Sequence, residues 1–399
     1  MGISLGKAGG GQKDSGRPRI AVIGPVYPYK GGISHYTGLL VAALRKRFQV
    51  KTISYSMQYP KFLFHKEQRD YENDSFRVDD AKFLINTANP INILRIGGAV
   101  NRWKPDLVII EWWHPYFAPC YRLLSMRIHA KILFICHNVF PHERFPLDRF
   151  LTRLTLKKGS FYLLHSEKEA SELKTIRKSP RYWINMHPTY DMFRTLGEGD
   201  SPEPAGASEE GRSDRKLLFF GFVRPYKGLH YLLRALAILK KEAFPVKLTV
   251  AGDFGGTYPE YGREMAELGI EDLVEIHDGY TPDREVQNYF NACDAAVLPY
   301  TDATQSGIAQ IAFGFRKPVI ATRAGGLPEV VREGETGVLC SPSDERDLAE
   351  AIRRFYSLRG RVDFQRNIEA DGDRFSWDHM ADTIGEILLE AMGRRGKKS

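Results

Sequence analysis

Short apolar runs alternate with longer amphipathic stretches along most of the chain. In the first half the runs are residues 19–26, 50–56, 106–113, 131–138 and 160–166, and in the second half 216–221, 247–252, 274–279, 295–299, 317–322 and 336–340. Continuous apolar runs of this length are typical of strands that are buried on both faces of a parallel sheet. The pattern therefore predicts a largely parallel sheet in each half.

The stretches between these runs carry apolar residues at helical spacing. Examples are HYTGLLVAALRKRF (35–48), LHYLLRALAILKKE (229–242) and SDERDLAEAIRRFY (343–356). Strands that alternate with helices predict βαβ units, so each half reads as a doubly wound α/β domain. A last helical pattern, FSWDHMADTIGEILLEAM (375–392), follows the second set of strands.

One segment between the halves cannot contribute to a core. Residues 196–216 are rich in Gly, Ser, Pro, Glu and Asp and nearly free of large apolar side chains, which is typical of a linker. A chain of 399 residues also exceeds a single comfortable core. We therefore predict a disordered tail (1–18), an N-terminal domain (19–195), the linker (196–216), a C-terminal domain (217–372), and a helix that packs at the domain junction before a basic tail (373–399).

Composition excludes several classes of protein. With 43% hydrophobic and 27% charged residues, the chain is typical of a soluble globular protein. The four cysteines are scattered without a C-x-x-C pair, so neither a disulfide framework nor a zinc site is indicated, and we expect no metal. No apolar run reaches the roughly 18 residues of a membrane span. We expect a cytoplasmic protein.

The net charge of +8 suggests an anionic partner. We find no nucleic-acid-binding module and expect no nucleic acid as partner. Arg45, Lys46 and Arg47 close the amphipathic stretch 35–48, an arrangement that suits contact with an anionic membrane surface at the inner face of the membrane. The competing interpretation is a solvated helix end.

Two loops of the second half suit phosphate binding. Arg224 and Lys227 lie three apart directly after the run 216–221, and Thr304, Gln305, Ser306 and Gly307 open a helix after the run 295–299. Backbone N–H groups at a helix start and fixed cations both stabilise a phosphate. Such a site can neutralise a diphosphate leaving group without a metal ion.

Taken in order, several motifs resemble the family 4 glycosyltransferases of the GT-B fold. They are GPVYPYKGGISHYTGLLVAAL, CHNVFPHE, HSEKEASEL, FFGFVRPYKGLHYLLRAL, VAGDF, GYTPDREVQNYFNACDAAVLPY and KPVIATRAGGLPEVVREGETGVLC. The resemblance implies two facing Rossmann-like domains with a C-terminal helix that crosses back. It also implies a nucleotide-sugar donor on the C-terminal domain, an acceptor on the N-terminal one, and retention of anomeric configuration without a metal ion.

The resemblance assigns roles to individual residues. Lys227 matches the lysine that contacts the donor diphosphate, while the usual arginine position is Phe222 here and Arg224 is its displaced substitute. Glu329 lies in the GGLPE turn, near the expected donor site, although acids are favoured at helix starts in any case. His137 matches a histidine that contacts the transferred sugar.

The chain departs from the family at two further positions. The paired glutamates that usually precede the KPVIAT strand fall at Ala303 and Ile311, so both carboxylates are absent. Asp302 or Gln310 is a partial replacement, and the TQSG sequence resembles a subset of the same family. The sugar and ribose contacts assigned to these acids are therefore open.

In the first half, Gly31 and Gly32 follow the first apolar run, where only glycine lets a phosphate or sugar approach the backbone closely. Their spacing is not G-x-G-x-x-G, which argues against a dinucleotide dehydrogenase.

These observations predict a retaining, metal-independent glycosyltransferase of cell-envelope or exopolysaccharide biosynthesis. It would need no cofactor and would use a nucleoside diphosphate sugar and a glycan or lipid-linked acceptor. Two alternatives remain open: a catalytically silent protein that binds nucleotide or glycan, and a nucleotide-sugar epimerase or phosphorylase on the same fold.

Overall fold

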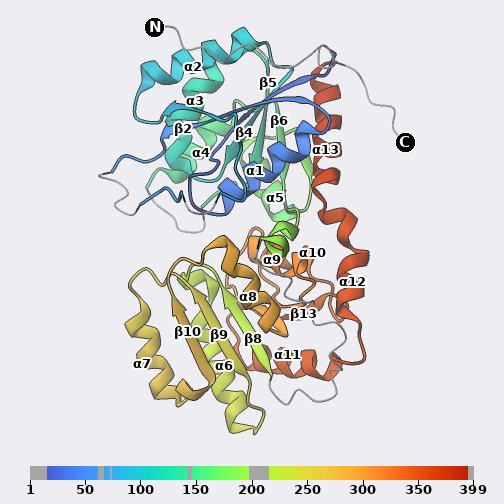
Figure 1. The fold of residues 1–399 in the computed structure, drawn as a ribbon. Helices are drawn as coiled ribbons and strands as arrows, with labels where there is room; N and C mark the ends of the chain where they lie inside the picture. The colour runs from blue at the N-terminus through green and yellow to red at the C-terminus, as the bar shows by residue number, and fades with distance from the viewer. Residues whose placement is uncertain (1–15, 62–66, 72–73, 142–145, 197–214, 394–399) are drawn as a thin grey trace. The chain divides into compact units, whose positions relative to one another are not determined.

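The computed structural model describes residues 16–61, 67–71, 74–141, 146–196 and 215–393. The chain forms two compact units, of which unit 1 contains residues 1–186 and 376–399 and unit 2 contains residues 187–375. Each unit has one parallel sheet with helices packed against it, so the predicted pair of Rossmann-like α/β domains is confirmed (Figure 1).

Unit 1 has a seven-stranded sheet in the order β3-β2-β1-β4-β5-β6-β7, in which every pair is parallel. Its strands are β1 (Arg19–Ile23), β2 (Gln49–Met57), β3 (Lys82–Asn86), β4 (Leu107–Trp112), β5 (Lys131–Cys136), β6 (Phe161–Leu164) and β7 (Tyr182–Ile184). Its helices are α1 (Gly32–Arg45), α2 (Pro90–Trp103), α3 (Ala118–Arg127), α4 (Asp148–Leu156), α5 (Glu167–Ile176) and α13 (Trp377–Ala391), with the 3₁₀ turn η1 (Pro115–Phe117).

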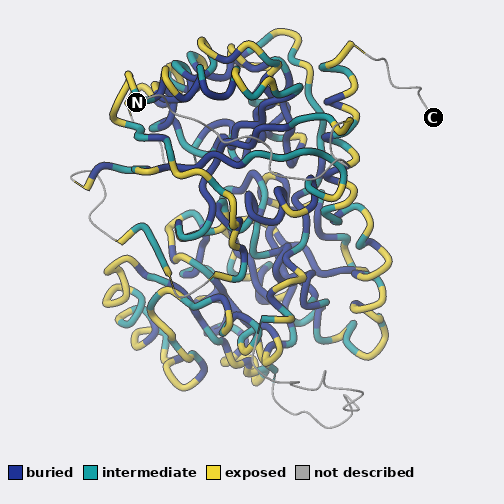
Figure 2. The backbone as a smooth tube through the Cα atoms, turned by 45° about the horizontal axis from the view of Figure 1, so that its top comes forward, coloured by how far each residue is buried: buried dark blue, intermediate teal, exposed yellow. Residues whose placement is uncertain are grey.

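Both faces of this sheet are buried because alternate residues of each strand enter different cores. Ala21 and Ile23 of β1 pack in a cluster with α2, α3, α4 and α5, whereas Ile20 and Val22 pack in a second cluster with α1 and α13. The continuous apolar run of β1 reflects this two-sided burial. Figure 2 shows the buried segments of the backbone in dark blue.

Unit 2 has a six-stranded parallel sheet in the order β10-β9-β8-β11-β12-β13. Its strands are β8 (Lys216–Phe220), β9 (Lys247–Gly252), β10 (Val274–Asp278), β11 (Ala295–Leu298), β12 (Val319–Thr322) and β13 (Gly337–Cys340). Its α-helices are α6 (Leu229–Lys241), α7 (Tyr258–Leu268), α8 (Val286–Ala292), α9 (Gly307–Gly314), α10 (Leu327–Val330), α11 (Glu345–Leu358) and α12 (Phe364–Ala370). Its 3₁₀ turns are η2 (Asp191–Thr195), η3 (Pro225–Lys227), η4 (Glu271–Leu273), η5 (Asp283–Glu285) and η6 (Gly372–Phe375).

In both sheets the strand order reverses beside the first strand, between β1 and β4 in unit 1 and between β8 and β11 in unit 2. At such a point the loops after neighbouring strands diverge and leave room for a ligand at the carboxyl edge. The loops that the sequence singled out, Gly31-Gly32 after β1 and Arg224–Lys227 after β8, both start at these points.

The units divide the chain at different residues from the predicted domain boundaries. Unit 2 begins at His187, and η2 packs on α9 within that unit, whereas the boundary expected from composition was the linker at 196–216. Most of that linker (197–214) and most of the tail (1–15) lie outside the described residues.

The last helix belongs to unit 1. Met380, Ala381, Ile384, Ile387 and Leu388 of α13 are buried, and the helix packs against α1. The last helix therefore returns to the first domain, as expected. Among the described residues, no helix has the length and apolar character needed to cross a membrane.

Candidate active site

The loop after β8 places Lys227 inside unit 2. The side chain is 8% exposed, and burial together with the nearby charge of Arg224 lowers the pKa of Lys227 to about 8. Its Nζ lies 3.3 Å from the point that a Cβ on Gly221 would occupy and 5.8 Å from the centre of the Tyr300 ring. A buried cation with no carboxylate partner among the described residues is costly, and a bound anion would stabilise it.

Arg224 differs from Lys227 because it is exposed. Its Nη1 lies 3.1 Å from the point that a Cβ on Gly255 would occupy, so the guanidinium extends toward the loop after β9. The two cations thus emerge from one loop into different surroundings, one in the protein interior and one at the surface.

The loop after β11 is joined to the lysine loop through backbone atoms. The backbone N–H and the hydroxyl of Thr301 both donate to the carbonyl oxygen of Tyr226, at 2.7 and 3.2 Å. Gly228 adopts φ +67°, and a Cβ there would lie 2.1 Å from the carbonyl oxygen of Pro299. Only glycine fits at this crossing point.

The segment 304–307 forms the start of α9, as the sequence predicted. Ser306 caps the helix, since its hydroxyl accepts a hydrogen bond from the backbone N–H of Ala309 at 3.3 Å, and its side chain also bonds to Tyr300. Thr304 is buried, and the Oε1 atom of Gln305 is buried with no hydrogen-bond partner among the described residues.

Gln310 is the most unusual polar group of this region. It is fully buried in α9, and neither its Oε1 nor its Nε2 has a hydrogen-bond partner among the described residues. The positions that lack the glutamates, Ala303 and Ile311, are 1% and 8% exposed. Unsatisfied buried amides are rare in proteins, so Gln305 and Gln310 together indicate a place for a polar ligand.

Glu329 lies in the first turn of the short helix α10, half-buried. The same turn is fixed against the α9 loop at Gly325, which has φ +51° and whose Cβ would lie 1.5 Å from the carbonyl oxygen of Ala303. The loops after β8, β11 and β12 therefore meet at the carboxyl edge of the sheet of unit 2.

In unit 1, Gly31 and Gly32 lie at the start of α1. Gly31 has φ 102° and ψ 165°, a conformation that only glycine adopts readily, and a Cβ on either residue would meet no atom of the described residues within 4 Å. The open space beside both glycines agrees with the predicted close approach of a ligand.

His137 lies at the end of β5 and is paired with a residue that sequence reasoning missed. Its Nε2 lies 2.8 Å from Oε2 of Glu111 on β4, and both side chains are at most 1% exposed. Burial lowers the pKa of His137 to about 3 and raises the pKa of Glu111 well above its ordinary value. Burial thus disfavours the charged form of both groups, and a protonated Glu111 carboxyl would donate to Nε2.

The surroundings of this pair explain why it is inaccessible. The ring of Tyr36 lies 4.5 Å from the His137 ring, edge to face, and a Cβ on Gly24 would lie 2.6 Å from Cγ of Glu111. Nδ1 of His137 and Oε1 of Glu111 have no hydrogen-bond partner among the described residues. A direct contact between His137 and a sugar requires these covering groups to move. An acid in the middle of the apolar run DLVIIEWW was the signal for Glu111.

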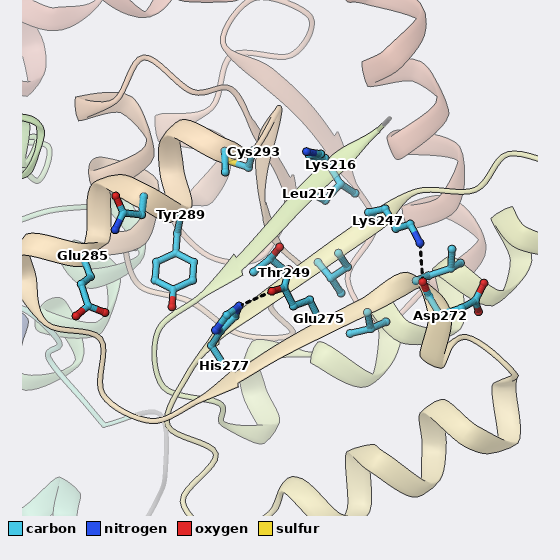
Figure 3. A pocket seen from close by; sticks show the side chains of 15 residues that line it. Lys216, Leu217, Lys247, Thr249, Asp272, Glu275, His277, Glu285, Tyr289 and Cys293 are labelled. Carbon is cyan, nitrogen blue, oxygen red and sulfur yellow. Dashed lines mark hydrogen bonds and ion pairs between the residues drawn. The ribbon is translucent and has the colours of Figure 1, made fainter. Parts of the chain in front are cut away.

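A cavity of about 610 Å³ lies elsewhere in unit 2, on the face of β8, β9 and β10 beside α8 (Figure 3). Two hydrogen bonds join residues of its lining: His277 pairs with Glu275 at 3.0 Å, and Lys247 donates to the backbone carbonyl oxygen of Asp272 at 2.6 Å. None of the predicted site residues lines it. We therefore do not assign it to the donor.

The predicted membrane cluster is neutralised within unit 1. Lys46 pairs with Asp378 at 3.0 Å, and Arg45 and Arg47 pair with Asp80 and Asp382. Since each cation has its own carboxylate, these three residues do not form a free basic patch.

The arrangement of unit 2 agrees with comparisons to known proteins. Residues 214–357 match the family model described as glycosyl transferases group 1. The chain is 30% identical over 222 residues to D-inositol 3-phosphate glycosyltransferase of Acidothermus cellulolyticus, covering 51% of this chain and 49% of that protein. It is 29% identical over 199 residues to glycogen synthase of Mycobacterium tuberculosis, covering 49% of this chain and 47% of that protein.

The chain spans about half the length of these curated relatives. Solved structures match nearly the whole chain. Sucrose-phosphate synthase of Thermosynechococcus elongatus gives a TM-score of 0.69 at 17% identity over 94% of this chain and 100% of that one. HepE of Anabaena, solved with UDP-glucose, gives a TM-score of 0.69 at 19% identity, and the match covers 93% of this chain and 99% of that one. Residues 214–357 therefore form a glycosyl transferases group 1 domain, and the chain has the GT-B glycosyltransferase fold.

Proposed function

We propose that this protein transfers a sugar, with retention of configuration and without a metal ion, from a nucleoside diphosphate sugar to a glycan or lipid-linked acceptor in cell-envelope or exopolysaccharide biosynthesis. The observation that carries the proposal is the buried Lys227 at the switch point of a glycosyl transferases group 1 domain, with its pKa lowered to about 8. A buried cation has lost most of its hydration, so a bound anion stabilises it.

This loop and the relatives support a nucleoside diphosphate sugar as the donor class. A diphosphate carries charge that grows as the glycosidic bond breaks, so Lys227 and Arg224 would stabilise the leaving group more than the bound donor. The matching HepE structure contains UDP-glucose, which supports a uridine diphosphate sugar as the first donor to test.

The buried amides of Gln305 and Gln310 would take the polar contacts that the absent glutamates cannot supply. In this proposal the hydroxyls of the sugar or ribose satisfy both side chains. Ala303 and Ile311 supply no carboxylate nucleophile, so in this proposal a donor phosphate oxygen would deprotonate the acceptor. His137, held by Glu111, would orient the sugar once the groups that cover it have moved.

A direct experiment separates transfer from mere binding. We expect a nucleoside diphosphate to raise the melting temperature, with a gain of roughly 2.7 kcal/mol at a hundredfold excess over Kd. We also expect release of the diphosphate from its sugar to continue in EDTA. No thermal shift with any nucleoside diphosphate would reject the donor site. A shift without transfer to any acceptor or release by water would favour the catalytically silent alternative.

A further inference from the structure

The helices α2, α3 and α4 lie side by side over one face of the unit 1 sheet (Figure 1). Several large apolar side chains on these helices are exposed to solvent. Five large apolar residues of the described chain are more than 60% exposed, and four of these belong to this helical face: Ile91, Met126, Leu147 and Phe150. Leu94 of α2 is a further exposed residue, at 41%. Isolated apolar side chains are normal at a surface, but a group of this kind indicates an interaction site.

The same helices carry one sign of charge. Their sequences contain six arginines, which are Arg95, Arg102, Arg122, Arg127, Arg149 and Arg153. The single acid of the three helices, Asp148, is buried. Apart from Arg102, none of these arginines forms an ion pair with a described carboxylate. This face, the α2–α4 face, is therefore basic as well as apolar.

The opposite face of the same sheet has the opposite character. The helix α13 carries Asp378, Asp382, Glu386 and Glu390 and no lysine or arginine, and it neutralises Lys46 and Arg47. Acidic residues thus lie on the α13 side of unit 1, and exposed arginines without an ion pair to a described carboxylate lie on α2, α3 and α4.

We propose that the α2–α4 face binds an anionic lipid surface, with its apolar side chains inserted among the headgroups and its arginines at the lipid phosphates. Helices with exposed apolar residues between basic ones lie in this way at a bilayer interface, and each basic residue near the surface strengthens binding about fivefold. Charge complementarity selects the occupant, because an apolar protein surface would not require six arginines. The proposal does not depend on the transferase activity.

The test uses the full-length protein and vesicles of phosphatidylcholine with or without phosphatidylglycerol. The variant Arg95→Gln, Arg149→Gln, Arg153→Gln removes three charges from exposed positions that form no ion pair with a described carboxylate. The matched control, Arg45→Gln, Lys46→Gln, Arg47→Gln, removes three charges from the neutralised cluster. We expect the first variant to bind anionic vesicles on the order of a hundredfold more weakly than wild type. The control should lose no more than about tenfold in affinity.

A second variant, Met126→Ser with Phe150→Ser, tests insertion. It should weaken the binding that persists at high salt, because salt screens the arginines and leaves the apolar contribution. Three results would overturn the proposal: no sedimentation of the wild type with anionic vesicles, equal binding to pure phosphatidylcholine, or equal loss in both charge variants. A vesicle-independent dimer that the serine variant dissociates would assign the face to a second copy of the chain instead.

Discussion

Lys227 combines a cost in stability with a use in binding. Its pKa in the folded protein lies about 2.5 below the ordinary value of 10.5, which corresponds to about 3 kcal/mol. Below about pH 8 the lysine is charged in both states, and its burial destabilises the folded state by this free energy relative to the unfolded chain, where water solvates the charge. As pH rises from about 8 to 10.5, the folded lysine is already neutral, so the penalty disappears.

We therefore predict that Lys227→Met raises the free energy of unfolding at pH 7 by up to about 3 kcal/mol while lowering kcat on the order of 10² to 10³. The stability difference between variant and wild type should shrink as pH rises above about 8. Urea denaturation at several pH values measures this difference. A variant that is less stable than wild type at pH 7 would show that the charge is already compensated in the absence of a ligand.

Glu111 is a positioning residue for His137 in our interpretation. Glu111→Gln keeps a donor for Nε2 and should preserve turnover and the Nδ1–H tautomer of His137, whereas Glu111→Ala should lose about 1 to 3 kcal/mol of stability and part of the activity. Nitrogen-15 NMR of the histidine ring reports the tautomer. If Glu111→Gln is as inactive as Glu111→Ala, the carboxyl acts as an acid or an anion and the neutral pair is the wrong description.

At the scale of elements, most strands could be predicted because they are buried on both faces. The strands that the sequence missed, β3 and β7, are the two edges of the unit 1 sheet and are mostly half-buried or exposed, so they contain no continuous apolar run. The Arg45–Arg47 cluster illustrates another limit. Its partners Asp378 and Asp382 lie more than 300 residues away, and no local pattern predicts such pairing.

The candidate site was predictable to a similar extent. Lys227, Arg224 and the 304–307 helix start follow directly from their strands, and the carboxyl edge of a parallel sheet brings these loops together. The burial of His137 beneath Tyr36 and Gly24 depends on tertiary packing between separate elements, which periodicity does not report.

The contact between the GGLPE turn and the α9 loop gives an element-scale prediction. Gly325→Ala would place a Cβ 1.5 Å from the carbonyl oxygen of Ala303 at a left-handed φ, so the loop before α9 must shift. We expect lower stability and weaker nucleoside diphosphate binding by calorimetry. Gly262→Ala in α7, where a Cβ meets nothing within 4 Å, is the control and should be neutral or slightly stabilising. Unchanged affinity in Gly325→Ala would separate this turn from the donor site.

For the whole molecule, the discontinuity of unit 1 is the decisive feature. A chain that ends at Phe375 would lack α13 and expose the apolar cluster that its five buried side chains cover. Since core truncations each cost about 2 to 5 kcal/mol, their sum exceeds the usual stability of a domain. We predict that scanning calorimetry of this truncation shows the transition of unit 2 alone. A chain that ends at Gly393 should keep both transitions, and cooperative melting of unit 1 without α13 would contradict the prediction.

The same discontinuity sets an order of events at the ribosome. The first segment of unit 1 ends at Met186, and more than half of the chain is synthesised after that residue. At the usual speed of translation this interval lasts on the order of ten to forty seconds, during which residues 187–375 can fold as an uninterrupted unit. During this interval the apolar surface of unit 1 that α13 later covers is exposed to solvent. The protein's demand for chaperones during its synthesis should therefore fall on its first domain, although that domain emerges first.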